Sequence, residues 1–155
     1  MVCTFAPEMP VLPGQRAEAS ATGRTAKRIR VLLADDSEHV MREIEHLLVP
    51  EFDIVGKATD GASLVSAAGR LRPDLIVTDL EMPGLSGIEA SRATLQVCPG
   101  LPILLLTAHG DRNLIQEALD AGIRGYVQKL AAADELILAA YGALRGETFI
   151  SPAFR

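Results

Sequence analysis

The stretch Asp74–Gly87 constrains the fold of this chain more than any other. Leu75, Ile76 and Val77 form a short continuous apolar run, which is typical of a strand buried on both faces of a parallel sheet. The run ends at Asp79, and Pro83-Gly84 then interrupts regular structure. A carboxylate at the carboxyl end of such a strand lies where open α/β sheets place their ligands and their chemistry.

Strand-like and helix-like segments alternate along the rest of the chain. Short connections between them predict right-handed crossovers and a doubly wound α/β fold, in which a five-stranded parallel sheet carries helices on both faces. The expected strands are 29–34, 52–59, 74–79, 102–107 and 124–129. The expected helices follow Ser37, span 62–71 and 86–97, follow Asp111 as far as Gly122, and begin at Asp134 and end before Gly146.

The composition fits one domain with an aliphatic core, since 48% of the 155 residues are hydrophobic and none is Trp. Two cysteines, Cys3 and Cys98, are too few for a disulfide framework or a metal knuckle, so both are expected to be reduced thiols. The sequence has no secretory signal and no apolar run near the ~20 residues of a membrane span. We therefore expect a cytoplasmic protein that does not enter a membrane.

The sequence divides into three parts. Residues 1–28 are rich in Pro and Gly and have little periodicity, so they are expected to be a disordered leader, or the product of a wrongly chosen upstream start codon. Residues 29–146 form the folded domain, and 147–155 a short tail. The net charge of −5 divides into +2 over residues 1–28 and −7 over 29–155, where eleven basic and eighteen acidic residues stand. An acidic domain argues against a nucleic-acid surface spread over the fold.

Polar side chains stand at the carboxyl ends of four expected strands. Asp35 and Asp36 follow the first strand, Asp79 ends the third, Thr107 ends the fourth and Lys129 ends the fifth. In a doubly wound sheet these ends share one edge, so the groups converge. Three carboxylates need a cation, and oxygen ligands with partial hydration suit Mg²⁺. Together with a hydroxyl and an ammonium, they indicate a site for a hard cation and a phosphoryl group.

These residues resemble the receiver domain of bacterial two-component response regulators, over roughly residues 29–144. The resemblance implies a flavodoxin-like sheet with strand order 2-1-3-4-5. The matching features are the acidic pair Asp35-Asp36, Asp79 in Asp-Leu-Glu-Met-Pro-Gly, Thr107-Ala108, and Gly125-Tyr126 with Lys129 three residues later.

The resemblance implies that Asp79 is phosphorylated. Mg²⁺ would be held by Asp36, Asp79 and the backbone carbonyl of Glu81, with Asp35 acting through water. Lys129 and Thr107 would contact the phosphoryl oxygens. The domain would then be a signalling phosphoacceptor, with no enzymatic activity beyond its own phosphorylation and dephosphorylation.

Three further residues have implied regulatory roles. Tyr126 is either a half-buried packing residue of its strand or the aromatic switch that fills the space left when Thr107 moves. Glu81 and His109 stand two residues after Asp79 and Thr107, where the family's side chains adjust the hydrolysis of the phosphoryl group.

The implied partners are a sensor histidine kinase or phosphotransfer protein as donor and a downstream protein as target, with a homodimer left open. Leu130 stands where the family often has a cis proline, a departure that resembles the NarL/FixJ class, whose receivers precede a helix-turn-helix domain. Residues 146–152 also resemble the start of that class's linker. Only nine residues follow the last expected helix, so this chain alone is not expected to bind DNA.

Three alternatives remain to be weighed. One is a truncated receiver of a DNA-binding transcriptional regulator. Another is an aspartate-nucleophile phosphatase, a class whose two acids after the first strand are usually two residues apart, whereas Asp35 and Asp36 are adjacent. The third is a receiver-like module that is never phosphorylated, but such modules typically lose an acid, the Thr or the Lys, and all are present here.

Overall fold

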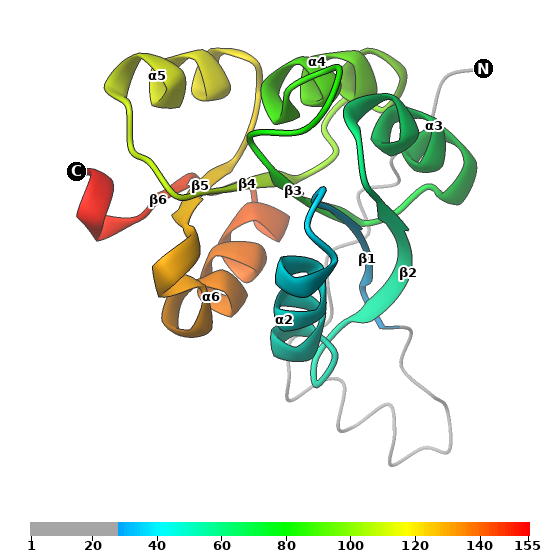
Figure 1. Cartoon of the computed structure of the whole chain (residues 1–155), viewed down its shortest axis with the longest axis horizontal. Coiled ribbons are helices and arrows are strands. Elements are labelled where there is room, and N and C mark those ends of the chain that lie inside the picture. The colour runs from blue at the N-terminus through cyan, green and yellow to red at the C-terminus, as the bar shows by residue number, and fades with distance from the viewer. Residues whose placement is uncertain (1–27) are drawn as a thin grey trace.

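The computed structural model describes residues 28–155, which form one parallel sheet between two layers of helices (Figure 1). The sheet of this described part has six strands in the order β2-β1-β3-β4-β5-β6, and all neighbours are parallel. The strands are β1 (Arg30–Ala34), β2 (Asp53–Ala58), β3 (Leu75–Asp79), β4 (Ile103–Thr107), β5 (Gly125–Gln128) and β6 (Phe149–Ile150).

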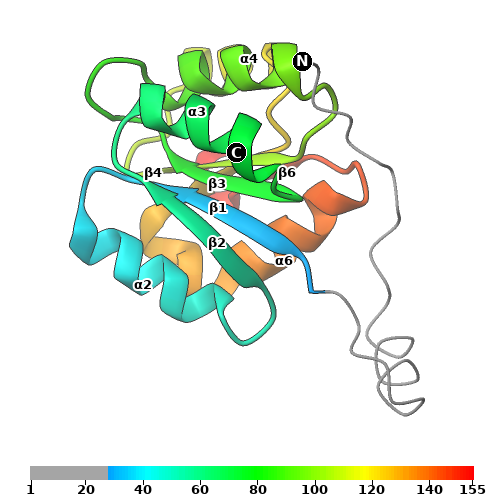
Figure 2. The ribbon, with the colours of Figure 1, turned by 90° about the vertical axis from the view of Figure 1, so that its right-hand side faces the viewer.

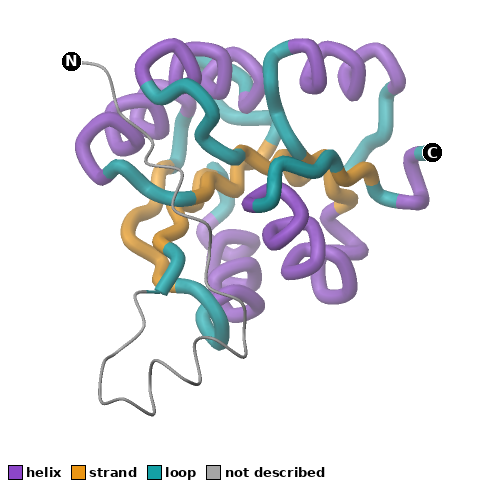
Figure 3. Tube along the Cα trace, turned by 180° about the vertical axis from the view of Figure 1, so that it is seen from behind, coloured by secondary structure: helices purple, strands orange, loops and turns teal. Residues whose placement is uncertain are grey.

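Within residues 28–155, five α-helices cover the sheet, three on one face and two on the other (Figures 1 and 2). Seen from behind, the strands again form a single layer between the helices (Figure 3). One face carries α3 (Gly61–Leu71), α4 (Gly87–Val97) and α5 (Arg112–Asp120), and the other carries α2 (Glu38–Leu48) and α6 (Ala132–Leu144). Two short 3₁₀ helices, η1 (Lys129–Ala131) and η2 (Pro152–Phe154), follow β5 and β6.

The central strands are apolar without interruption because both of their faces are buried. In β1, Leu32 belongs to the core beneath α3, α4 and α5, while Val31 and Leu33 belong to the core beneath α2 and α6. In β3, Ile76 belongs to the first of these cores and Val77 to the second, and every residue of that strand is buried. These two cores hold the strand ends at one edge of the sheet, where the polar residues stand.

Side-chain caps fix the helix starts close to the sheet edge. The hydroxyl of Ser37 accepts a hydrogen bond from the Val40 amide, as expected for the residue that begins α2. At α4, the Ser86 hydroxyl accepts from the Glu89 amide at 3.1 Å, and the Glu89 carboxylate accepts from the Ser86 amide at 3.0 Å. This reciprocal pair satisfies two backbone donors that the first turn leaves without intrahelical partners.

Ser86→Ala is expected to lower the free energy of unfolding by about 1 kcal/mol, because the Glu89 amide loses its acceptor. Urea unfolding followed by circular dichroism measures the change. Ser66→Ala is the control, since Ser66 is exposed inside α3 and its replacement should change stability by less than about 0.5 kcal/mol. Equal effects of the two substitutions would contradict a capping role for Ser86.

The predicted fold class is confirmed, and three details differ. Residues 147–155 were expected to be a tail, but Phe149 and Ile150 add a sixth strand beside β5. Lys129 does not end β5; it begins η1, which carries the chain directly into α6. The last helix therefore begins at Ala132, two residues before the expected Asp134. In the described residues every peptide bond is trans, and the side chain of Leu130 is 91% exposed.

The predictions for residues 1–27, including the leader and Cys3, lie outside the described residues. Arg28, the last residue assigned to the leader, donates hydrogen bonds to the carbonyl oxygens of Val49 and Phe52 and lies 3.5 Å from the Asp53 carboxylate. Cys98 is a buried, reduced thiol. Among the helices of residues 28–155, none combines the length and apolarity needed to cross a bilayer.

Candidate functional site

The polar residues predicted from the strand ends do meet at one edge of the sheet. Asp35 directly follows β1, Asp79 ends β3, Thr107 ends β4 and Lys129 directly follows β5. A cavity of about 250 Å³ opens at this edge. It is lined by Asp36, Asp79, Glu81, Thr107, Ala108, His109 and Lys129.

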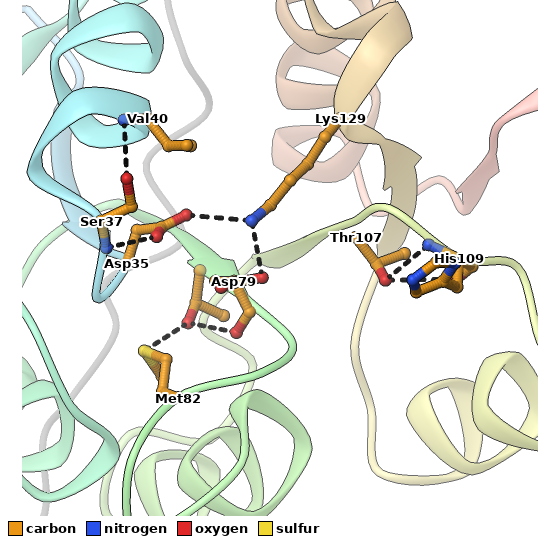
Figure 4. A network of polar contacts seen from close by, with 9 residues as sticks. Asp35, Ser37, Val40, Asp79, Met82, Thr107, His109 and Lys129 are labelled. Atoms are coloured by element: carbon orange, nitrogen blue, oxygen red, sulfur yellow. Dashed lines mark hydrogen bonds and ion pairs between the residues drawn. The ribbon is translucent and has the colours of Figure 1, made fainter.

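Lys129 joins two of the carboxylates (Figure 4). Its Nζ lies 3.1 Å from Asp79 Oδ1 and 3.3 Å from Asp35 Oδ2. The other oxygen of Asp35 accepts a hydrogen bond from the Ser37 amide at 2.8 Å. Asp35 and Asp79 are almost fully buried, with exposed fractions of 4% and 5%. One ammonium group thus faces two buried carboxylates.

The carboxyl groups of Asp35, Asp36 and Asp79 lie close together and face one ammonium group, that of Lys129. Burial raises the pKa of Asp79 above its ordinary value, and the nearby Asp35 carboxylate raises it further, against the opposing effects of Lys129 and the backbone of Glu81. Burial alone would lower the pKa of Lys129, but its hydrogen bond to Asp79 and the attraction of both acids raise it. One ammonium group thus stands against a cluster of three carboxyl groups, those of Asp35, Asp36 and Asp79.

This cluster fits a hard divalent cation. Asp35, Asp36 and Asp79 each offer one carboxylate oxygen, and the three atoms lie within 4.8 Å of one another. Oδ2 of Asp35 is buried and forms an ion pair with Lys129 at 3.3 Å, and no other described group donates a hydrogen bond to it. Asp36 is exposed at the cavity mouth, so a partly hydrated ion could reach it. An all-oxygen site with room for water is the chemistry that Mg²⁺ prefers.

Neighbouring residues in the sequence fix the position of the Asp79 backbone. A β-carbon at Gly87 would overlap the carbonyl oxygen of Asp79, so only glycine lets α4 begin this close to the end of β3. The Thr78 hydroxyl donates a hydrogen bond to the same carbonyl oxygen at 3.0 Å. Gly84, in the intervening loop, has φ of 77°, a conformation that glycine adopts without strain. The Pro83-Gly84 interruption thus returns the chain sharply to α4.

Thr107 lines the cavity, but its hydroxyl is hydrogen-bonded to the backbone of His109. Its hydroxyl donates to the carbonyl oxygen of His109 at 3.1 Å and accepts from the His109 amide at 3.2 Å. Figure 4 shows the hydroxyl directed at the His109 backbone and away from Asp79. The side chains of Glu81 and His109 are exposed and line the cavity.

Tyr126 does not line the cavity, and it is fully buried, not half buried. Burial raises the pKa of its hydroxyl, against the opposing effect of the nearby Thr107 side chain. The ring of Phe154 covers that of Tyr126 edge-on, with centroids 5.6 Å apart. The position of Phe154 was not predicted, although the apolar pair Phe149-Ile150 is a signal that this segment packs on the domain.

Comparison with known proteins decides the family. The model of the response regulator receiver domain matches residues 31–141, which is most of the chain. The chain belongs to the receiver domain family of response regulators. The predicted resemblance is therefore confirmed, and the described strand order is that of the flavodoxin-like receiver fold with β6 added. Receiver domains are signalling proteins of two-component systems and not conventional enzymes.

The receiver domain is similar in sequence to part of several curated response regulators, one of them named as a transcriptional regulatory protein. It is 32% identical over 127 residues to the transcriptional regulatory protein DegU of Brevibacillus brevis, covering 81% of this chain and 54% of DegU. It is 31% identical over 126 residues to the response regulator GacA of Pseudomonas aeruginosa, covering 80% of this chain and 59% of GacA. The chain thus spans a little over half the length of these relatives.

Solved structures agree with the described fold. A LuxR-family response regulator from Aurantimonas superposes with a TM-score of 0.78 at 32% identity, covering 83% of this chain and 93% of that one. The isolated receiver domain of RcsB from Salmonella enterica, determined with the phosphomimetic BeF₃⁻, superposes with a TM-score of 0.75 at 27% identity. That comparison covers 83% of this chain and 96% of the RcsB chain.

Proposed function

We propose that this receiver domain accepts a phosphoryl group on Asp79 with Mg²⁺ bound, and that it passes the resulting change of shape to a partner protein. The observation that carries the proposal is the meeting of three carboxylates and one lysine at the sheet edge. Asp36, Asp79 and the backbone carbonyl of Glu81 would hold the Mg²⁺ ion, with Asp35 acting through water. The ion would neutralise the repulsion between the Asp79 carboxylate and the anionic phosphoryl donor.

The covalent step is a displacement at phosphorus. An oxygen of Asp79 forms a P–O bond while the bond from phosphorus to the donor breaks, and the electron pair stays with the leaving atom. Membership of the family supports a phosphohistidine of a sensor kinase or phosphotransfer protein as that donor. Hydrolysis reverses the state: water forms a new P–O bond, Asp79 leaves as a carboxylate, and inorganic phosphate is released with the proton taken up by solvent.

The other cavity residues have supporting roles. Lys129 pairs with a phosphoryl oxygen in place of one of its carboxylate partners, and Thr107 donates its hydroxyl to another phosphoryl oxygen after releasing the His109 backbone. Tyr126, which lies behind Thr107, responds to that movement. Glu81 and His109 line the cavity from the solvent side, where they would adjust the access of the hydrolytic water.

The relatives support a regulatory setting for the proposal. DegU is named as a transcriptional regulatory protein, and another solved structure shows RcsB dimers bound to DNA. We propose that this receiver acts in the cytoplasm, forms homodimers or binds another protein when phosphorylated, and controls transcription through that contact. A DNA-binding output belonging to the same regulator is the alternative that the NarL/FixJ-like features and the length of the relatives favour.

The roles of the two adjacent acids give a metal-binding prediction. Asp35 is buried and already bonded to the Ser37 amide and Lys129, whereas Asp36 faces the cavity. Asp35→Ala is expected to weaken Mg²⁺ binding about tenfold, as for a group acting through water. Asp36→Ala should weaken it further, since a direct ligand is lost. Calorimetric titration of both variants decides the ranking, with exposed Asp53 replaced by Ala as the control. The reverse ranking would exchange the two roles.

The 155-residue chain by itself is expected not to bind DNA specifically. Residues 29–155 carry a charge of −7, which repels phosphates and gives no affinity from counterion release. Fluorescence anisotropy at physiological salt, with and without a phosphoryl donor, measures binding to promoter-length duplexes. We expect only weak, salt-sensitive binding. Sequence-selective binding at nanomolar protein would contradict this prediction and assign a DNA-reading surface to the receiver itself.

A further inference from the structure

The C-terminal segment Glu147–Arg155 is built into the domain. Phe149 and Ile150 form β6 beside β5, and the Phe149 and Ser151 amides donate to the carbonyl oxygens of Arg124 and Tyr126, both at 2.9 Å. Ser151 is fully buried, and its hydroxyl accepts from the Gln128 amide at 2.8 Å. These bonds fasten the segment along the last part of β5, directly before Lys129.

Ser151 also ties the segment to α6. Its hydroxyl donates a hydrogen bond to the carboxylate of Glu135, in the first turn of that helix. A buried hydroxyl that both donates and accepts is costly to leave without partners. The segment therefore has a defined docked position, and its release would expose the edge of β5.

Phe154 connects this segment to Tyr126 and to the loop that follows β4. Its ring packs edge-on against Tyr126, and it lies so close to Gly110 that a β-carbon there would overlap the ring. Gly110 directly follows His109, whose backbone holds the Thr107 hydroxyl. The docked position of Phe154 thus depends on the present course of the loop that leads away from Thr107.

We propose that Glu147–Arg155 is an intramolecular strap that is closed in the unphosphorylated domain and is released when Asp79 is phosphorylated. This inference rests on the proposed function. For its hydroxyl to reach a phosphoryl group on Asp79, Thr107 must give up both bonds to His109, and the loop through Gly110 must follow. Phe154 packs directly against Gly110, so that a β-carbon at Gly110 would overlap its ring. Movement of the loop therefore removes the surface on which the Phe154 ring packs. Release then uncovers Tyr126 and the edge of β5.

The coupling must act in both directions. If phosphorylation weakens the docking of the strap, a docked strap weakens phosphorylation by the same factor in equilibrium terms. Phe154→Ala should therefore strengthen binding of the phosphoryl mimic BeF₃⁻ about fivefold or more, the lower end of ordinary coupling energies. Leu138→Ala, which truncates a 61% exposed side chain on α6, is the matched control and should leave binding unchanged.

Amide hydrogen exchange of the full 155-residue chain, measured by NMR, tests release directly. With Mg²⁺ and BeF₃⁻, exchange at the Phe149 and Ser151 amides should accelerate by about tenfold or more, while the Ile76 amide of β3 stays protected. A response of the Asp79 resonances with unchanged or slower exchange at Ser151 would overturn the strap alone. No response at Asp79 would overturn the proposed function, and the coupling with it.

A double-mutant cycle tests the contact without any phosphoryl mimic. Gly110→Ala should accelerate exchange at Ser151, because the added methyl group occupies the place of the Phe154 ring. In a Phe154→Ala background the same substitution should have no further effect, since the overlap is gone. Equal effects of Gly110→Ala in both backgrounds would show that Gly110 acts through the loop alone, and would overturn the strap.

Discussion

Asp79→Asn should abolish phosphorylation. Incubated with Mg²⁺ and acetyl phosphate, the wild-type chain should gain one phosphoryl group in intact-mass spectrometry, and the variant should gain none. The amide is nearly the same size as the carboxylate, but it is a poor nucleophile and offers no negative oxygen to a cation. Asp120→Asn, on the exposed side of α5, is the control and should be labelled like the wild type. Equal labelling of the Asp79→Asn variant and the wild type would remove Asp79 from its proposed role.

The same variant has a second expected property that separates lost chemistry from lost folding. Asp79 is buried beside Asp35, which disfavours its charged form, so a neutral side chain should not lower the melting temperature in EDTA. Wild-type chain should gain about 1.4 kcal/mol of stability at a Mg²⁺ concentration roughly ten times Kd, whereas the variant should gain little. A variant that melts far below the wild type in EDTA would indicate a folding defect.

Lys129→Met should have the second largest effect. The substitution keeps a long side chain but removes the ammonium that lies 3.1 Å from Asp79 and 3.3 Å from Asp35. Loss of one positive group aimed at developing phosphoryl charge typically costs about 10²-fold in rate, so labelling by acetyl phosphate should slow by that order. Time courses of intact mass measure the rate.

Stability measurements check that Lys129 acts through the two acids. Without Mg²⁺, Lys129→Met leaves two buried carboxylates without a counter-charge, so the melting temperature should fall, and Mg²⁺ should restore it. In an Asp79→Asn background the loss should shrink. Lys57→Met is the matched control, because Lys57 pairs with Glu45 on the surface. If Lys57→Met slowed labelling as much as Lys129→Met, the effect would reflect general charge and not the site.

Most of the site was predictable because it depends on strand ends. A run such as Leu75–Val77 is typical of a strand buried on both faces, and parallel strands bring their carboxyl ends to one edge. Asp35, Asp79, Thr107 and Lys129 therefore converge from positions that are far apart in sequence. The periodicity of the helices and their caps, such as Ser37 and Ser86, also follow from local rules.

What could not be predicted depends on contacts between distant segments. Nothing local to Phe154 indicates that it covers Tyr126, or that Gly110 makes room for it. A two-residue strand such as β6 has too little periodicity to be recognised, and it forms because β5 leaves an open edge. The hydrogen-bond partner of the Thr107 hydroxyl could not be predicted either, because this hydroxyl could bond to either His109 or a phosphoryl group.

Chemical mapping of the phosphorylated residue tests the central claim most directly. The wild-type chain is treated with Mg²⁺ and acetyl phosphate and then with borohydride, which reduces an acyl phosphate to an alcohol, and the peptides are sequenced by mass spectrometry. We expect homoserine at position 79 and unmodified aspartate at positions 35 and 36. Homoserine at either member of the acidic pair, or at none of the three positions in a chain that has gained a phosphoryl group, would contradict the account.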